Sequence, residues 1–167
     1  RDCMVKGPLA GYPVVGIHAT LDDGSYHPVD SSEMSFKMAA SLAYKEGLPK
    51  AGPVILEPIG KLCVFVPDSM IGDIIGGVSK SRGTVLGMTP TERKGEQMVE
   101  AEVPMSEMTD YPITLRAMTQ GRGRFTFEFD RYEEAPAEIA QKIIDERKAE
   151  LEKMATGLDW IAENPAR

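Results

Sequence analysis

The sequence predicts an α+β protein built from a partial βαβ half-domain, a complete ferredoxin-like β-α-β-β-α-β sandwich and a C-terminal helix. Between residues 61 and 132, short runs rich in β-branched and aromatic residues alternate with segments whose apolar residues recur every three or four positions. A segment with proline and glycine, residues 58–60, separates this pattern from a shorter strand–helix–strand pattern and is typical of a hinge. We therefore expect three parts: residues 1–58, 59–135 and 136–167.

The expected half-domain begins with a strand over residues 12–21, where β-branched residues precede an Asp-Asp-Gly turn signal. Asp30 stands three positions before Glu33, which is the spacing of a capping box. In such a box each side chain pairs with a backbone N–H of the first helical turn. This spacing predicts an amphipathic helix over residues 31–46, and a short apolar strand follows at residues 54–58.

The second module shows the clearer alternation. Its expected strands cover residues 61–66, 84–88, 97–103 and 124–132, and its expected helices begin at Pro67 and Pro112. The first of these helices carries apolar residues at i, i+3, i+4 and i+7, namely Ile71, Ile74, Ile75 and Val78. Three phenylalanines alternate with polar residues along the last strand. This pattern predicts that Phe125, Phe127 and Phe129 pack against the two helices.

A third helix is expected from Pro136 to Ala155. One face carries an apolar stripe that needs a surface to cover it, formed by Ile139, Ile143, Ile144 and Leu151. We expect residues 157–167 to form a short helix or a frayed tail. The two strands of the half-domain make too small a sheet to be stable alone, so we expect an exposed strand edge that invites dimerisation. The absence of an initiator methionine suggests a fragment of a longer protein.

The net charge of −7 argues against a generally basic nucleic-acid-binding protein, because phosphate binding depends on clustered Lys and Arg. The charge is unevenly spread, however. Residues 133–167 hold nine acidic and five basic residues, which leaves −3 for the first 132 residues. Basic side chains gather in the second module: Lys80, Arg82, Arg93, Lys94, Arg116, Arg122 and Arg124. Composition alone leaves a local RNA-binding patch and ordinary solvated charge both open.

We expect no catalytic residue, cofactor or metal in this chain. No Gly-x-x-x-x-Gly-Lys-[Ser/Thr] run is present, and Cys3 and Cys63 lie far apart, which predicts reduced thiols. Ser25, His27 and Asp30 lack the nucleophile elbow and oxyanion donors that acyl transfer needs. No apolar run approaches the roughly 20 residues of a membrane span, and the start lacks a signal-peptide stretch. We therefore expect a soluble cytoplasmic protein.

Three motifs follow the order of one known family. They are Asp22-Asp23-Gly24-Ser25-Tyr26-His27-Pro28-Val29-Asp30-Ser31-Ser32-Glu33, Ser81-Arg82-Gly83-Thr84-Val85-Leu86-Gly87-Met88 and Thr119-Gln120-Gly121-Arg122-Gly123-Arg124-Phe125. Through these motifs the chain resembles elongation factor G, the GTPase that drives translocation on the ribosome. The resemblance implies the second half of the tip-bearing fourth domain, the whole fifth domain, and a helix that packs back on residues 1–58. GTP and Mg²⁺ would bind a domain of the parent protein that is absent here.

The resemblance also implies where the chain meets the ribosome. Ser25, Tyr26 and His27 would form the tip that contacts the tRNA–mRNA complex in the decoding region. Polar groups at helix ends would contact the large-subunit rRNA and the stalk base, namely Ser81, Arg82, Gln120 and Arg122. Pro28 stands where the family usually carries an acidic residue, which predicts a stiffer and less negative loop. The motifs leave elongation, ribosome recycling and antibiotic protection open as roles of the parent.

Other interpretations remain open from the residues themselves. His27 is also typical of a solvated turn histidine. The run from Arg122 to Phe129 superficially resembles the RNA-binding strand of an RNA recognition motif, although it is expected on the fourth strand and not the third. The alternative for the whole chain is a free-standing ferredoxin-like module that binds RNA or senses a small molecule. A P-loop GTPase upstream in the longer gene would discriminate between the two.

Overall fold

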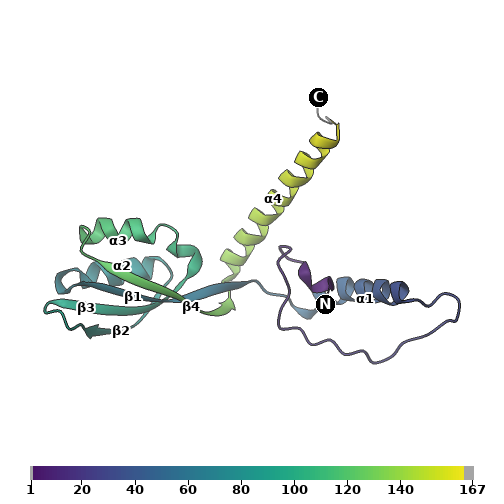
Figure 1. Cartoon of the computed structure of the whole chain (residues 1–167), viewed down its shortest axis with the longest axis horizontal. Helices are drawn as coiled ribbons and strands as arrows, with labels where there is room; N and C mark the ends of the chain where they lie inside the picture. The colour runs from purple at the N-terminus through teal and green to yellow at the C-terminus, as the bar shows by residue number, and fades with distance from the viewer. Residues whose placement is uncertain (1, 164–167) are drawn as a thin grey trace. The chain divides into compact units, whose positions relative to one another are not determined.

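The computed structural model describes residues 2–163, with side chains for residues 2–155. The chain forms two compact units (Figure 1). The sheet unit is Leu56–Glu134, and the terminal unit combines Arg1–Ile55 with Ala135–Arg167. Within the described part of the chain, no helix is both long enough and apolar enough to cross a membrane.

The sheet unit is a four-stranded antiparallel sheet with two helices on one face (Figure 1). Its strands are β1 Leu56–Pro67, β2 Thr84–Pro90, β3 Glu96–Pro104 and β4 Arg124–Glu134, in the order β2-β3-β1-β4. Its helices are α2 Ile71–Lys80 and α3 Tyr111–Thr119, preceded by the short 3-10 helices η3 Asp68–Met70 and η4 Met105–Met108. This order confirms the predicted α+β class and its ferredoxin-like sandwich.

The core of the sheet unit consists of alternate residues of the two central strands together with helix residues one turn apart. The strand residues are Leu62, Val64, Val66, Val99, Ala101 and Val103, each exposed by 1% or less. α2 adds Ile74 and Val78, and α3 adds Leu115. Side chains on one face of a strand recur every two residues and on one face of a helix every three or four. The core therefore follows the periodicities that predicted it.

Two of the three phenylalanines of β4, Phe125 and Phe127, pack against this core as predicted. The ring of Phe125 meets that of Tyr111 edge-on, with centroids 5.3 Å apart. The predicted core role of Phe129 is wrong, because its side chain is 53% exposed. The register of β4 shifts just beyond this residue, and the ring of Phe129 lies 5.2 Å from that of Tyr132 instead.

The predicted hinge at residues 58–60 is also wrong, because these residues lie inside β1. Pro58 pairs with Tyr132 of β4, but the pairing of β1 with β3 begins only at Ile59. A residue without an N–H is tolerated where a strand has one neighbour. Gly60 has a packing role, since a Cβ there would lie 2.2 Å from Cζ of Phe127. Pro58 therefore marks the part of β1 that pairs with only one strand, and Gly60 marks a close contact with Phe127.

The terminal unit contains α1 Glu33–Gly47 and two short 3-10 helices, η1 Asp2–Val5 and η2 Leu48–Ala51. The predicted capping box does not form. The N-cap is Ser32, whose Oγ accepts the N–H of Ser35 at 3.1 Å. Asp30 contributes through its backbone, because its carbonyl accepts the hydroxyl of Ser35 at 2.9 Å.

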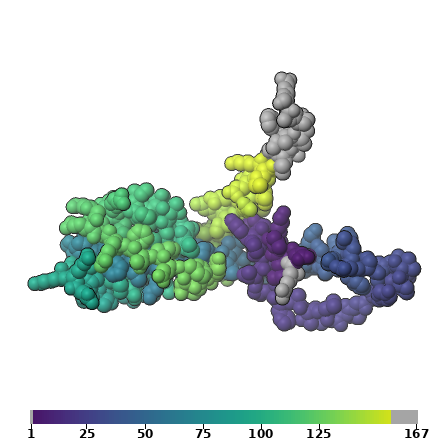
Figure 2. Space-filling view, in the orientation of Figure 1, coloured from purple at the N-terminus to yellow at the C-terminus, as the bar shows by residue number. Residues whose placement is uncertain are grey.

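Residues 2–55 contain no β-strand, which corrects the predicted βαβ half-domain. Residues 12–21 are an irregular and mostly exposed segment, and the second predicted strand exists only from Leu56 onward, as the start of β1. A strand needs a hydrogen-bonded neighbour, and the described residues of this unit supply none. The predicted exposed strand edge is therefore wrong for the described residues of this unit, and dimerisation of the chain stays a prediction. Figure 2 shows an opening between this segment and α1.

The long helix α4 Ala137–Glu163 packs an apolar stripe against other parts of the terminal unit. The small core consists of Ala10, Ile55 and Ala135, with Leu9, Ile139, Ala140, Ile143 and Ile144 packed against it. Leu151 was predicted to belong to the stripe but is 47% exposed. Residues 157–163 continue α4 and do not form a separate short helix, and residues 164–167 lie outside the described part.

Candidate nucleic-acid interface

The loop before α1 carries the first set of predicted contact residues, Ser25, Tyr26 and His27, all of them exposed. Backbone and side-chain hydrogen bonds close its turn. The N–H of His27 donates to Oγ of Ser31 at 2.7 Å, and the N–H of Ser31 donates to the carbonyl of His27 at 2.9 Å. Nδ1 of His27 lies 3.1 Å from Oδ2 of Asp30. The imidazole is therefore oriented by its own loop.

Most of this oriented imidazole remains in solvent. The side chain of His27 is 64% exposed, and among the described residues its Nε2 has no hydrogen-bond partner. Tyr26 is 72% exposed. Exposed hydroxyl, phenol and imidazole groups can hydrogen-bond phosphates and ribose hydroxyls, and planar rings can stack on unpaired bases. The loop thus has the chemistry of an RNA contact.

The second set of predicted residues lies in two turns of the sheet unit. At the end of α2, the N–H of Ser81 donates to the carbonyl of Gly77 at 3.0 Å, and Arg82 has a left-handed backbone with φ of 57°. The N–H of Gly83 then donates to the carbonyl of Val78 at 2.8 Å. A Cβ on Gly83 would lie 2.7 Å from Cγ1 of Val78, so the turn leaves no room for a side chain there.

Arg82 is not a free surface cation. Its Nη1 and Nη2 donate to the two carboxylate oxygens of Glu57 at 2.9 and 2.8 Å, and its Nε donates to Glu107 at 3.1 Å. The side chain of Glu57 is only 8% exposed. The hydrogen bonds with Glu57, and then those with Glu107, raise the pKa of the Arg82 guanidinium, against the lowering effect of burial. The guanidinium is therefore already bound by carboxylates of its own unit.

The turn at the end of α3 presents a different kind of arginine. Gln120 has a left-handed backbone with φ of 54°. The buried hydroxyl of Thr119 donates to the carbonyl of Leu115 at 2.7 Å and accepts the N–H of Gly123 at 2.9 Å. Arg122, between these residues, is exposed, and its side chain has no hydrogen bond or ion pair within the described residues. Arg122 is thus available to a phosphate.

The turns after α2 and α3 lie at different positions along the direction of strand β1. Thr84 follows the first turn and pairs with Glu102, which in turn pairs with Lys61 of β1. Arg124 follows the second turn and pairs with Phe65 of β1. Four residues of β1 separate these positions, which corresponds to about 13 Å at 3.3 Å per residue. The four predicted residues therefore form two separate sites.

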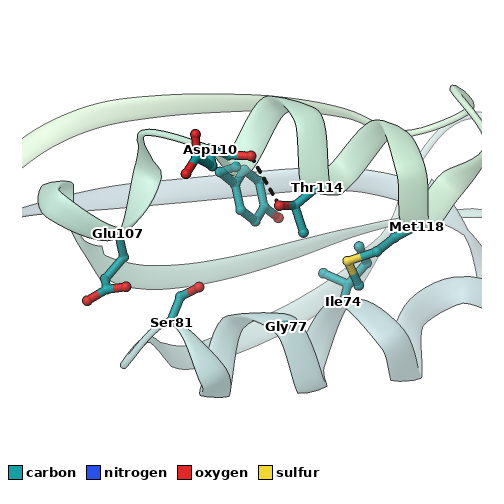
Figure 3. A pocket seen from close by; sticks show the side chains of 8 residues that line it. Ile74, Gly77, Ser81, Glu107, Asp110, Thr114 and Met118 are labelled. Carbon is teal, nitrogen blue, oxygen red and sulfur yellow. Dashed lines mark hydrogen bonds between the residues drawn. The ribbon is translucent and has the colours of Figure 1, made fainter.

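A small hollow of about 70 Å³ lies between α2 and α3, and Figure 3 shows the side chains around it. Its polar lining is Ser81, Glu107, Asp110 and Thr114, and its apolar lining is Ile74, Gly77 and Met118. Tyr111 also lines it, is 6% exposed, and has a hydroxyl without a hydrogen-bond partner among the described residues. Burial raises the pKa of this phenol to about 12.

The sequence did not predict the two carboxylates that bind Arg82, those of Glu57 and Glu107. The one signal for Glu57 is an acidic residue within an apolar strand, and Glu107 carries no signal at all. Both cysteines, Cys3 and Cys63, are free and half-buried. Within the described residues, no group of three or more His, Cys, Asp or Glu side chains could hold a metal ion.

Two family models match the chain. The model described as elongation factor G, domain IV, covers residues 1–52, and the model described as elongation factor G C-terminus covers residues 54–143. The chain belongs to the elongation factor G family. It is therefore part of a translation elongation factor, and the two matched regions meet close to Ile55, where the first segment of the terminal unit ends.

Individual relatives agree with this assignment to the elongation factor G family. An elongation factor G-like protein of Thermotoga maritima is 51% identical over 153 residues, which is 92% of this chain and 22% of that protein. A crystal structure of a protein from Thermus thermophilus is 42% identical, covers 89% of this chain and 22% of the other, and superposes with a TM-score of 0.78. The chain thus spans about a fifth of the length of these relatives.

Proposed function

We propose that this chain is the C-terminal, ribosome-contacting part of a cytoplasmic translational GTPase that promotes the movement of tRNA and mRNA during protein synthesis. The observation that carries the proposal is the match of residues 1–52 to domain IV of elongation factor G, because this segment contains the exposed loop. Ser25, Tyr26 and His27 would contact the tRNA–mRNA complex there. Their exposure and hydrogen-bonding groups support this role.

The nucleotide would be bound elsewhere in the longer protein. GTP and Mg²⁺ need a phosphate-binding loop with a lysine and a hydroxyl residue, and the 167 residues contain no such run. The residues of this chain therefore do not fit the nucleotide, and no hydrolysis step involves them. Within the proposed factor, this chain serves as the part that touches the ribosome.

The sheet unit would contact the large-subunit rRNA and the stalk base. Ser81 and Arg82 belong to the turn after α2, and Gln120 and Arg122 belong to the turn after α3. The guanidinium of Arg122, which has no partner among the described residues, supports a phosphate contact most directly. The acidic net charge does not oppose this, because release of counterions depends on the local charges that meet the phosphates.

His27→Ala in the full-length factor tests the tip. We expect translocation to slow about tenfold, as for the loss of roughly 1.4 kcal/mol of transition-state contact. Ribosome-stimulated GTP hydrolysis should stay near normal, since the nucleotide is bound elsewhere. His18→Ala is the matched control, because this histidine is exposed but lies outside the hydrogen-bonded turn of residues 27–31. Equal losses of translocation and hydrolysis in His27→Ala would count against the proposed tip.

Arg122→Glu in the same protein tests the sheet unit. We expect weaker ribosome binding. The slope of the logarithm of affinity against the logarithm of salt concentration should also be less steep, by about the contribution of one phosphate contact. Lys94→Glu is the matched control, because it reverses a charge in the exposed β2–β3 turn. Unchanged affinity for Arg122→Glu across a salt titration would remove this residue from the contact surface.

A further inference from the structure

Arg82 joins three elements of the sheet unit at one point. It follows α2, it binds Glu57 at the start of β1, and it binds the segment η4 through Glu107 at 3.1 Å and through Oγ of Ser106 at 3.4 Å. Glu57 and Glu107 each lie 25 residues from Arg82 in sequence, on opposite sides. The interaction is therefore tertiary and ties the turn to two distant segments.

The geometry leaves Arg82 little capacity for RNA. A guanidinium has five N–H donors, and the four hydrogen bonds described use all three of its nitrogens. The two parallel bonds to Glu57 form the bidentate arrangement that binds a carboxylate most strongly. If Arg82 turned away to meet a phosphate, the carboxylate of Glu57 would be left buried without its partner, which is strongly unfavourable.

The same contacts fix the backbone that carries Ser81. The turn is held by hydrogen bonds from Ser81 and Gly83 back to α2, and Arg82 itself has a backbone conformation that residues other than glycine seldom adopt. Such a conformation persists only where surrounding contacts maintain it. The bidentate ion pair with Glu57 is a side-chain contact that can maintain it.

We propose that Arg82 is a positioning residue, which acts through Glu57 to hold the Ser81-bearing turn in the conformation that meets the ribosome, and does not itself bind rRNA. This inference rests on the proposed function, because it concerns one of the surfaces through which the factor would bind. It assigns Glu57, whose side chain is only 8% exposed, an indirect role in ribosome binding.

Glu57→Gln in the full-length factor separates the two roles of Arg82, because only the positioning role predicts weaker ribosome binding. If Arg82 positions the turn, loss of the carboxylate should raise the ribosome concentration for half-maximal GTP hydrolysis about tenfold, with an unchanged maximal rate and salt slope. If Arg82 binds phosphate, freeing it from Glu57 should leave the affinity unchanged or tighter. Arg82→Lys adds a second variant: a positioning role predicts the same loss, since lysine lacks the bidentate fork.

Glu102→Gln is the matched control for a merely structural effect. Glu102 also forms a bidentate pair, with Arg131 at 3.0 and 2.8 Å, but its pair lies on the strands β3 and β4. We expect normal ribosome binding by Glu102→Gln. An equal loss of affinity in both variants would overturn the proposal, because it would show that any lost ion pair weakens binding.

Hydrogen exchange of this 167-residue chain supplies a readout that does not depend on the ribosome. In Glu57→Gln, the amides of Ser81 and Gly83 should exchange at least about tenfold faster, and in Glu102→Gln they should not. Unchanged exchange, or faster exchange with unchanged ribosome affinity, would overturn the proposal. Failure of the proposed function is recognised separately, because the unsubstituted factor would then show no ribosome-dependent hydrolysis or no movement of mRNA.

Discussion

Gly60 shows how single atoms determine the sheet unit. A Cβ at this position would lie 2.2 Å from Cζ of Phe127 and 2.8 Å from the carbonyl oxygen of Glu128. The ring is rigid and packs against the core, so it cannot move aside easily. We expect Gly60→Ala to lower the free energy of unfolding by at least about 2 kcal/mol, as overpacked core substitutions do. Urea unfolding of the chain measures this loss.

Gly76→Ala is the control within the same unit. Gly76 lies inside α2, and nothing is within 4 Å of a Cβ placed there. Alanine is favoured over glycine in a helix by about 1 kcal/mol, so this variant should be somewhat more stable. Similar losses in both glycine variants would contradict the steric explanation of Gly60.

Tyr111 should make the stability of the sheet unit depend on pH in the alkaline range. Burial raises the pKa of its phenol from 10.0 to about 12, so the folded chain holds the proton more tightly than the unfolded chain between these values. Stability should therefore fall as pH rises from about 10 to about 12. Tyr111→Phe removes this contribution, and its stability should fall less. Thermal unfolding at several alkaline pH values compares the two, and parallel curves would contradict the assignment.

At the scale of elements, the sequence predicted the sheet unit well and the terminal unit poorly. Each strand and helix of the sheet unit buries one face in one core, so the periodicity of its apolar residues reports the structure directly. In the terminal unit, α1 has no buried residue, and residues 12–21 have no strand to pair with among the described residues of that unit. Local preference for a strand does not form one without a neighbour. Pro58 and Gly60 led to the wrong prediction of a hinge, because proline and glycine also occur where a strand edge or close packing requires them.

The contact between α4 and the first segment of the terminal unit, Arg1–Ile55, can be tested by one substitution. Ile143→Ala should weaken the small core around Ala10 and Ile55 by roughly 2 kcal/mol, at the lower end for large-to-small changes. Exchange should accelerate at the amides of Gly7 and Val14, whose hydrogen bonds close the first segment. The sheet unit should keep its protection.

Leu151→Ala is the matched control on α4, because Leu151 is 47% exposed and lies outside that core. It should leave exchange unchanged. If the two variants behaved alike, α4 would not dock through the stripe that contains Ile143.

At the scale of the whole molecule, the sequence motifs led to the elongation factor G family but not to the state of each site residue. The exposure of Ser25, Tyr26 and His27 was predictable, because a polar turn before a helix remains in solvent. The engagement of Arg82 was not, because its partners lie 25 residues away on either side and only folding brings them together. The separation of the two turns likewise depends on strand register. Sequence thus identified the segments proposed to make contact, and folding determined which side chains are free.

Single-turnover movement of mRNA by the full-length factor tests the proposed role in translocation most directly. The unsubstituted protein would be mixed with GTP and ribosomes that carry tRNA in the pretranslocation state. We expect movement by one codon, slowed in His27→Ala and normal in His18→Ala. Ribosome-dependent GTP hydrolysis without any movement of mRNA would contradict the claim that this chain is part of a translocase.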